Sequence, residues 1–307
     1  MEKVIVVIGP TSVGKTKMGV ALAKKFNGEV ISGDSMQIYK QMDIGTAKVT
    51  EEEKEGIIHH CVDILNPDET YSVHDFQQTV RKKITEITQR GHVPIIVGGT
   101  GLYIKAALYD YQFDEMENDH HAINEKYKDY TNEQLHDHLK SIDEESAKTL
   151  HFNNRRRILR AIEIYETTGK RKSEMLEEQE HICLYDAYFV GLTLPRDILY
   201  ERINKRVDVM MKNGLKEEMD QLYSQGLTRN HQSMKAIGYK EWFDYYDRQI
   251  DLNDVLELIK KHSRQYAKRQ YTWFKNQFDV HWYDVNLENF EQTIEQVTDD
   301  IEKILKV

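Results

Sequence analysis

The sequence predicts an α/β fold, with a P-loop-type parallel sheet flanked by helices, a mainly helical insertion and a helical C-terminal region. Three observations lead to this prediction. Short apolar segments alternate with amphipathic segments of helical spacing over the N-terminal third of the chain. A glycine-bearing loop joins the first strand pattern to the first helix pattern. Only helix patterns follow Asp197. Repeated strand–helix units of this kind build a parallel sheet that is covered on both faces.

The first elements are assigned in chain order. The wholly apolar, β-branched run Val4–Ile8 predicts a strand that is buried on both faces. Apolar residues recur at helical spacing in Lys17–Phe26, which predicts a helix. Glu29–Gly33 predicts a second strand that ends on Asp34, and Cys61–Leu65 predicts a third.

The next elements continue this alternation. Ser72–Arg90 is a long amphipathic pattern, and Ser72 with Asp75 three residues later predicts a capping box at its start. Pro94–Val97 predicts another buried strand, which leads into Gly98-Gly99. Because the carboxyl ends of parallel strands share one edge of a sheet, we expect the segments that follow these strands to lie together.

The character of the sequence changes after Tyr109. Tyr111–Ser146 is polar, rich in histidine and without a strand pattern, which predicts a mainly helical insertion. We therefore expect an insertion over residues 113–149 and a core formed by residues 1–112 and 150–307.

The remaining elements belong to the C-terminal half. Asn154–Thr167 predicts a helix that Gly169 ends, and Ala187–Leu194 predicts a strand that stops at Pro195. Four helices are expected to follow, over Leu199–Gln225, Lys235–Gln249, Val255–Phe274 and Leu287–Leu305.

The composition is that of a globular protein of 307 residues with a net charge of −10. This total argues mildly against nucleic acid as a partner, although the local distribution of positive charge matters more. Cys61 and Cys183 are far apart and have no metal-binding or redox spacing, so we expect no disulfide framework. No secretory signal pattern and no apolar run of about 20 residues is found, so we expect a cytoplasmic protein without a membrane span.

The loop after the first strand matches the P-loop pattern at every fixed position. Its glycines allow successive backbone N–H groups to face a phosphate at the start of a helix. Lys15 adds a mobile positive charge, and the Thr16 hydroxyl is placed to bind Mg²⁺. The predicted phosphate-binding residues are Gly9, Thr11, Ser12, Val13, Gly14, Lys15 and Thr16.

The P-loop alone does not identify the phosphate, and its usual ligands are ATP and GTP. A guanine-reading Asn-Lys-x-Asp is not matched, because Asn204–Asp208 carries its aspartate one place late. Val30–Asp34 and Val62-Asp63 could each be read as a Walker-B strand, so this test leaves an ATPase open.

Six further blocks, in order, decide between these readings. They are Asp34–Tyr39, Met42–Lys48, Gly98–Tyr103, Arg157–Glu163, Ile237–Glu241, and Arg264–Gln270 with Thr272–Phe274. Together they resemble the signature of the tRNA dimethylallyltransferases, also called tRNA isopentenyltransferases. With the P-loop, the resemblance runs from residue 4 to about residue 275. Val49 and Phe152 each replace a usual proline, and residues 114–128 match poorly.

The resemblance implies a prenyl transfer from dimethylallyl diphosphate to N6 of adenosine 37, beside the anticodon of tRNA, with Mg²⁺ as cofactor. The P-loop then holds a diphosphate leaving group. Asp34 ends a strand at the ligand-binding edge and is assigned as the general base, an assignment that agrees with the family. The resemblance also assigns Thr100 to the substrate site and Arg206 to the diphosphate, with Arg202, one helical turn away, as the alternative.

Two basic stretches offset the acidic total locally, one around Arg155–Arg160 with Lys170–Lys172 and one over Lys260–Lys275. Cations that contact phosphates and aromatic rings that stack on bases suit RNA. The target base is expected to be turned out of its stack, with the Gln37 amide placed to read its edge. The predicted tRNA contacts are Asp34, Ser35, Met36, Gln37, Thr100, Arg156, Arg157, Arg160, Lys235, Gly238, Tyr239, Lys240, Arg264, Lys268 and Arg269.

Three alternatives remain beside this reading. A small-molecule or nucleotide kinase with the same core would consume ATP and ignore dimethylallyl diphosphate. An enzyme that prenylates free adenine nucleotides would have little use for the basic C-terminal half. A non-catalytic RNA-binding protein would bind tRNA and leave its mass unchanged. We further expect the protein to be a monomer.

Overall fold

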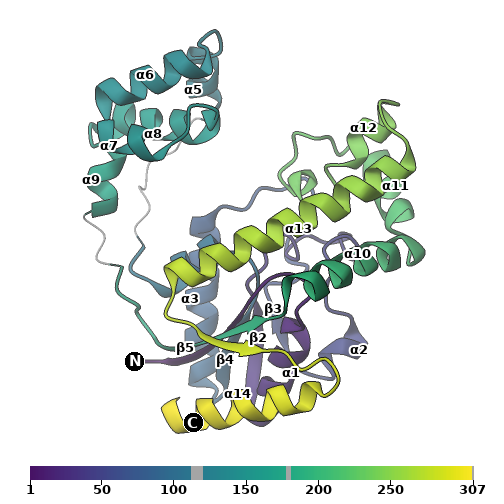
Figure 1. Ribbon diagram of the computed structural model, residues 1–307. Helices are drawn as coiled ribbons and strands as arrows, with labels where there is room; N and C mark the ends of the chain where they lie inside the picture. The colour runs from purple at the N-terminus through teal and green to yellow at the C-terminus, as the bar shows by residue number, and fades with distance from the viewer. Residues whose placement is uncertain (112–119, 178–180, 306–307) are drawn as a thin grey trace. The chain divides into compact units, whose positions relative to one another are not determined.

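The protein divides into two compact units. The first is formed by Met1–Tyr109 with Cys183–Val307, and the second by Asp110–Ile182. The computed structural model, drawn in Figure 1, describes residues 1–111, 120–177 and 181–305.

The first unit is built around one six-stranded sheet whose strands all run parallel, in the order β3-β2-β4-β1-β5-β6. This confirms the predicted α/β class. The strands are β1 (Lys3–Ile8), β2 (Gly28–Ser32), β3 (His59–His60), β4 (Val93–Val97), β5 (Asp186–Thr193) and β6 (His281–Asp284).

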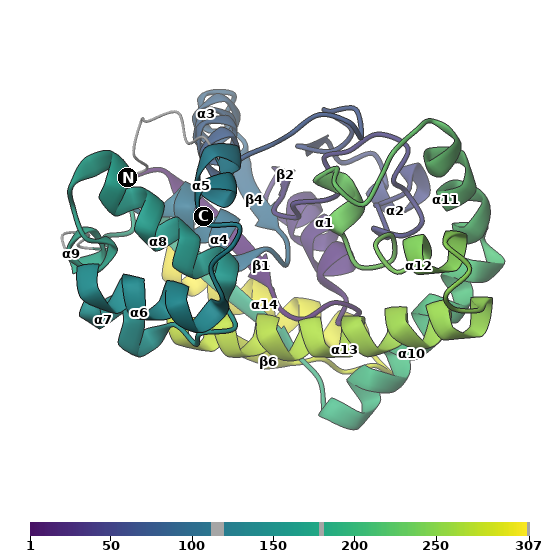
Figure 2. The ribbon, with the colours of Figure 1, turned by 90° about the horizontal axis from the view of Figure 1, so that it is seen from above.

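Helices cover both faces of this sheet, as expected for buried parallel strands. In both views α10 and α13 lie side by side (Figures 1 and 2). The helices of this unit are α1 (Lys15–Lys25), α2 (Glu51–Lys54), α3 (Val73–Gln89), α4 (Gly101–Leu108), α10 (Arg196–Lys212), α11 (Leu215–Ser224), α12 (Trp242–Tyr246), α13 (Leu252–Gln277) and α14 (Phe290–Leu305), with a 3₁₀ turn at Ser233–Lys235.

Strand β1 shows why the apolar run is continuous. Val4, Val6 and Ile8 belong to a core that includes residues of α3 and α4, whereas Ile5 and Val7 belong to a second core with residues of α1 and α14. All five side chains are fully buried. Successive side chains of a strand point to opposite faces, so a strand covered on both faces needs apolar residues at every position.

Both predicted helix signals are confirmed by the backbone. The Ser72 hydroxyl accepts a hydrogen bond from the Asp75 N–H, and the Asp75 carboxylate accepts one from the Ser72 N–H, which completes the capping box. Gly169 ends α8 (Arg155–Thr168) with φ 71°. A left-handed residue of this kind is the usual helix end, and glycine adopts it without steric cost.

Four expectations for the core are corrected. Cys61–Leu65 is not a strand: the third strand is the preceding His59–His60, and Cys61 and Asp63 have positive φ angles that a strand excludes. The long helix expected over Leu199–Gln225 is broken at Gly214, where φ is 100°. Most of Lys235–Gln249 forms turns around the short α12. Finally, β6 was not predicted.

The second unit contains helices only among its described residues. Leu135 and Leu139 of α6 pack with Ile158 and Ile162 of α8 in one apolar cluster. Because this cluster includes α8, the unit extends to Ile182 rather than ending at residue 149. Its helices are α5 (His120–Lys126), α6 (Asn132–Ile142), α7 (Glu144–Thr149), α8 (Arg155–Thr168) and α9 (Lys172–Glu177).

Across the described parts of both units, no helix combines the length and the apolar character that crossing a bilayer requires.

Candidate active site

The segments after β1, β2 and β4 meet at one edge of the sheet. The Gly98 N–H donates to the Val7 carbonyl at 3.1 Å, and the Gly33 N–H donates to the Val97 carbonyl at 2.8 Å. A Cβ atom on Gly98 would lie 2.3 Å from the backbone of Gly33. Only glycine permits this approach, which brings the segments after β2 and β4 together.

The P-loop occupies this edge. Gly9 (φ 145°) and Gly14 (φ 108°) adopt left-handed backbone angles that favour glycine, and α1 begins directly after Gly14. The Lys15 ammonium donates to the Pro10 carbonyl across the loop at 2.8 Å. The free N–H groups of the first helical turn and the Lys15 charge together form an anion site.

The surroundings of Lys15 disfavour its charged form. Desolvation lowers the pKa of Lys15 from 10.5 to about 7, and the nearby Arg206 adds to this effect, while Asp34 opposes it. Both neighbours therefore act on the lysine of the P-loop. A bound anion would favour the protonated ammonium again.

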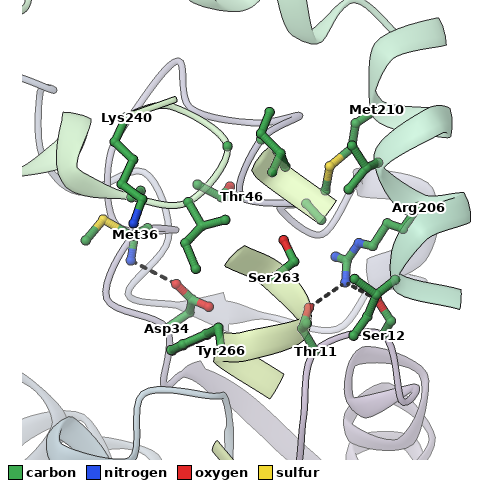
Figure 3. A pocket seen from close by; sticks show the side chains of 18 of the residues that line it. Thr11, Ser12, Asp34, Met36, Thr46, Arg206, Met210, Lys240, Ser263 and Tyr266 are labelled. Atoms are coloured by element: carbon green, nitrogen blue, oxygen red, sulfur yellow. Dashed lines mark hydrogen bonds between the residues drawn. The ribbon is translucent and has the colours of Figure 1, made fainter. Parts of the chain in front are cut away.

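Two arginines of α10 reach the P-loop, and they do so differently. Arg206 Nη1 donates to the Thr11 hydroxyl at 3.1 Å and approaches the Ser12 hydroxyl at 3.5 Å (Figure 3). Arg202 Nε donates to the Ser12 carbonyl at 3.0 Å. Burial lowers the pKa of Arg206, yet a guanidinium stays charged in proteins. The geometry thus favours Arg206 over Arg202 as the cation inside the site.

Asp34 lies opposite this cation. Its Oδ1 accepts the Met36 N–H at 2.8 Å, which fixes the carboxylate in a turn (Figure 3). No hydrogen bond to the other oxygen, Oδ2, is formed by the described residues. One oxygen is thus used for positioning, and the second is available to a ligand.

Thr100 precedes α4 and does not cap it, because its hydroxyl accepts no N–H of that helix. The hydroxyl instead accepts the Ser35 N–H at 3.1 Å and donates to the Ser35 hydroxyl at 3.3 Å. It also contacts Tyr266, whose pKa is raised to about 12, chiefly by burial and then by Asp34. Thr100 therefore fixes the segment after Asp34.

Two cavities open at this edge. The larger, of about 740 Å³, contains P-loop residues with Lys15 and Thr16, and the smaller, of about 340 Å³, contains Lys240 and Tyr266. The residues that line both are Thr11, Ser12, Asp34, Thr46, Ala47, Arg206 and Met210. The two cavities are therefore neighbours that share the Arg206 cation and the Asp34 carboxylate.

The larger cavity also offers a metal position. Thr16 lines it, and a hard oxygen ligand such as the Thr16 hydroxyl suits Mg²⁺. No group of three or more His, Cys, Asp or Glu side chains that could hold a metal is found among the described residues. The residues fit a Mg²⁺ ion that is shared with phosphate oxygens, which is the usual arrangement for this ion.

The comparison with known proteins agrees with this geometry. A family profile described as IPP transferase matches residues 37–277. The tRNA dimethylallyltransferase of Bacillus cereus (strain AH187) is 54% identical over 287 residues, which cover 92% of this chain and 90% of that protein. The chain belongs to the IPP transferase family.

Solved structures of relatives support the same assignment. The tRNA isopentenylpyrophosphate transferase from Staphylococcus epidermidis is 47% identical, covers 99% of both chains and has a TM-score of 0.74. The enzyme from Bacillus halodurans is 43% identical, covers 100% of this chain and 99% of that chain, with a TM-score of 0.75. A eukaryotic dimethylallyltransferase acting on tRNA is 32% identical, with a TM-score of 0.85, and covers 99% of this chain and 79% of its own.

Within this IPP transferase, several predicted tRNA residues gather around the smaller cavity. The lining residues among them are Asp34, Ser35, Met36, Lys235, Gly238, Lys240 and Arg269. The guanidinium of Arg269 lies 5.8 Å from the Tyr266 ring centre, a cation–π contact. Lys235, Lys240 and Arg269 are exposed, so their charges face solvent at the cavity mouth.

Other predicted tRNA residues have structural contacts. Tyr239 is completely buried and donates to Glu218, so its ring offers no surface to RNA and we do not retain it as a contact. The Gln37 amide lines the larger cavity and contacts Ser32, Thr46 and Ala47 within the chain. Arg264 donates to Asn204 at 2.5 Å.

The predicted arginines of α8 belong to the second unit. Arg156 and Arg157 are exposed, whereas Arg160 forms an ion pair of 2.8 Å with the buried Glu163. Arg155 donates to the carbonyls of Tyr127 and Tyr130 and so has a packing role. Arg156 and Arg157 remain the best candidates for contacts with a phosphate backbone in this unit.

Sequence reasoning missed Gln270 of α13. Its Oε1 accepts the Thr11 N–H at 3.0 Å, and its Nε2 donates to the Gly99 carbonyl at 3.0 Å. It therefore joins the P-loop to the segment after β4 and uses one loop N–H that would otherwise face an anion. The available signal was its place as an amide in the basic block Arg264–Gln270.

Proposed function

We propose that this enzyme transfers a dimethylallyl group from dimethylallyl diphosphate to N6 of adenosine 37, next to the anticodon of tRNA. The observation that supports this most is the shared lining of the two cavities. The Arg206 cation and the Asp34 carboxylate face one space from opposite sides, as Figure 3 shows. Arg206 can therefore stabilise a leaving anion, and Asp34 can accept the proton of the nucleophile, in the same space.

The diphosphate belongs in the larger cavity. Lys15, Arg206 and the N–H groups of the first α1 turn present positive charge to it before the reaction starts. Negative charge grows on the diphosphate as the allylic C–O bond breaks. Donors that are already in place stabilise this charge without reorganisation, which is the strongest form of electrostatic catalysis.

Mg²⁺ supplies further positive charge to the leaving diphosphate when it is bound. The Thr16 hydroxyl is the group of this chain that would hold it.

The adenine belongs in the smaller cavity. Its N6 amine is a weak nucleophile, because the lone pair is delocalised into the ring. The Asp34 carboxylate, held through Oδ1, accepts the N6 proton as the new C–N bond forms. Thr100 and Met36 position this carboxylate through the Ser35–Met36 backbone.

The tRNA is held by exposed cations around the smaller cavity. Lys235, Lys240 and Arg269 are exposed at this cavity, and cations of this kind neutralise backbone phosphates. To present N6, adenosine 37 leaves its stack and enters the cavity. The monomer expected from the sequence stays a prediction.

One experiment tests the proposal. The protein is incubated with unmodified tRNA, dimethylallyl diphosphate and Mg²⁺. The RNA is then digested, and the masses of its nucleosides are measured by mass spectrometry. We expect an adenosine that is heavier by one C5 unit. ATP turnover without such a product would contradict the proposal and favour a kinase.

A further inference from the structure

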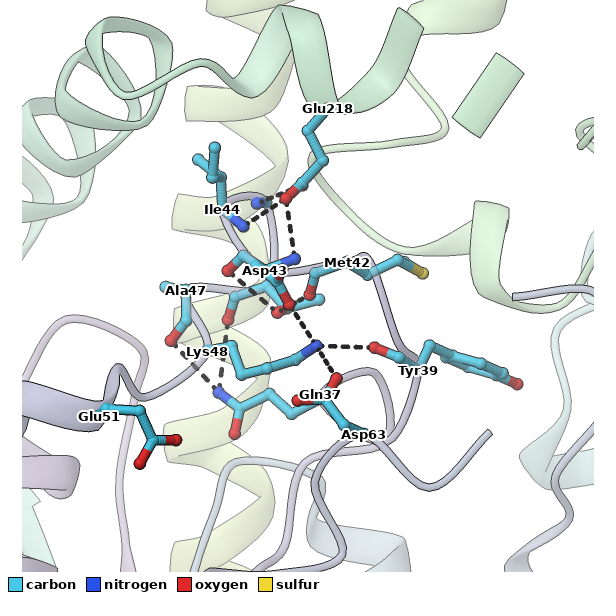
Figure 4. Close-up of polar contacts among 12 residues, drawn as sticks. Gln37, Tyr39, Met42, Asp43, Ile44, Ala47, Lys48, Glu51, Asp63 and Glu218 are labelled. Carbon is cyan, nitrogen blue, oxygen red and sulfur yellow. Dashed lines mark hydrogen bonds and ion pairs between the residues drawn. The ribbon is translucent and has the colours of Figure 1, made fainter. Parts of the chain in front are cut away.

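One carboxylate of the first unit accepts an unusual set of hydrogen bonds. Glu218 of α11 accepts the consecutive backbone N–H groups of Asp43 (2.8 Å), Ile44 (2.7 Å) and Gly45 (3.0 Å), as Figure 4 shows. It also accepts the Tyr239 hydroxyl at 2.6 Å. The first two bonds go to Oε2 and the other two to Oε1, so both oxygens are used twice.

The loop that Glu218 holds is Met42–Lys48, here called the wall loop. Its residues Thr46 and Ala47 line both cavities, and Gly45 lines the smaller one. The wall loop therefore forms part of the walls of both cavities.

Lys48 fixes the other end of the wall loop. Its buried ammonium donates to the Tyr39 carbonyl at 2.8 Å, to Asp43 at 2.6 Å and to Asp63 at 2.5 Å (Figure 4). These bonds all lie within the N-terminal segment. Glu218, by contrast, is about 175 residues away along the chain and ties this loop to the C-terminal helices.

Tyr239 makes the same connection to the other wall of the smaller cavity. A Cβ atom on Gly45 would lie 2.5 Å from the Tyr239 ring, so the wall loop packs directly on this residue. Gly238 and Lys240, its neighbours in sequence, line the smaller cavity. Burial, and after it the Glu218 carboxylate, raises the pKa of Tyr239 well above 10, so the hydroxyl stays a donor.

Hydrogen bonds continue from the wall loop to Asp34. The Gln37 amide approaches the carbonyls of Thr46 at 3.5 Å and Ala47 at 3.4 Å, and its oxygen accepts the Ser32 hydroxyl at 3.1 Å. The same Ser32 oxygen accepts the Asp34 N–H at 3.4 Å. A connected series of contacts thus leads from α11 to the backbone N–H of Asp34.

We propose that Glu218 is a positioning residue, which holds the wall loop and the Gly238–Lys240 turn so that the acceptor adenine meets Asp34 and the donor in line. The inference rests on the proposed function. The site needs an acceptor of four bonds that carries no donor of its own, which only a carboxylate provides. An amide would turn an N–H₂ group toward two of the four donors.

The test compares Glu218→Gln with Glu217→Gln, a matched control that removes the same charge from the exposed neighbouring residue. At saturating tRNA and dimethylallyl diphosphate, we expect kcat of Glu218→Gln to fall by about 10- to 100-fold, since small misplacements of reacting groups cost this much. The control should stay within about twofold of the wild type. Binding of inorganic diphosphate with Mg²⁺ should be unchanged in both variants, because the P-loop contacts are intact.

Each other outcome decides against the inference in a recognisable way. If kcat of Glu218→Gln equals that of the control in an active enzyme, Glu218 does not position the reaction. If kcat and the capacity for diphosphate fall together, the residue only supports folding. A wild type that adds no C5 unit refutes the proposed function itself. If Glu218→Gln does not fold, Tyr239→Phe replaces it: kcat should fall several-fold with diphosphate binding unchanged, and wild-type kcat would refute the inference.

Discussion

Lys15 gives the most specific prediction, because its charge state must change when diphosphate binds. With a pKa of about 7, only about a tenth of the Lys15 side chains carry a proton at pH 8 in the free protein. A bound diphosphate raises the pKa of Lys15 because an opposite charge favours the ammonium. Binding at pH 8 should therefore take up about 0.9 proton at this residue. By the same linkage, this residue lowers the affinity by up to about tenfold per pH unit above pH 7.

Isothermal titration calorimetry measures this uptake. Inorganic diphosphate is titrated with excess Mg²⁺ at pH 8 in two buffers that differ in ionisation enthalpy, and the difference in heat gives the protons exchanged. Lys15→Met reports the exchange by all other groups, including the diphosphate. Lys17→Met is the matched control, because Lys17 lines the same cavity but is exposed.

The expected result is that the wild type and Lys17→Met take up close to one proton more than Lys15→Met. If the wild type and Lys15→Met exchange the same number of protons, Lys15 is already charged in the free protein. The proposed environment of the P-loop lysine would then be wrong.

Three further predictions concern other residues. Asp34→Asn should lower kcat by about 10²- to 10⁴-fold and leave tRNA affinity unchanged in a filter-binding assay, and near-normal turnover would exclude Asp34 as the base. Arg206→Lys loses the planar fork at Thr11, so steady-state kinetics should show a rise in KM for dimethylallyl diphosphate of about tenfold, with KM for tRNA constant. Burial raises the pKa of Glu29, but hydrogen bonds from Arg90 and His60 outweigh this effect and lower the pKa below its usual value. Its carboxylate therefore stabilises the fold above pH 4.5, and this contribution is lost as pH falls below that value. Urea unfolding of Glu29→Gln should show a loss of about 1–3 kcal/mol at pH 7 that becomes smaller as the pH falls below 4.5.

The sheet and its functional edge were predictable because their signals are local. Val4–Ile8 and Pro94–Val97 are apolar at nearly every position, and glycines follow directly after both. The P-loop pattern fixes both the turn and the helix start, so its position in the structure follows from eight consecutive residues. Asp34 was found because it ends a strand at the same edge.

The remaining features depend on contacts between distant residues. Gln270 and Glu218 bind residues that are far away in the sequence, and the residues next to them in the sequence do not indicate these partners. A single glycine in a helical pattern is often tolerated, so Gly214 did not reveal the break that turns α11 toward the wall loop. Tyr239 was predicted as a tRNA contact because it belongs to a family block, but it is buried. A family block contains residues needed for packing as well as residues that bind a ligand.

The ends of the second unit lie next to each other. Leu184 N–H donates to the Leu108 carbonyl at 2.8 Å, and Asp110 N–H donates to the Ile182 carbonyl at 3.0 Å. Between them Tyr109 and Cys183 form an antiparallel bridge. The insertion therefore leaves and re-enters the core at adjacent positions, like a long loop. The entropic cost of closing such a loop depends only weakly on its length. A change in the length of this unit therefore leaves the two connections to the core in place.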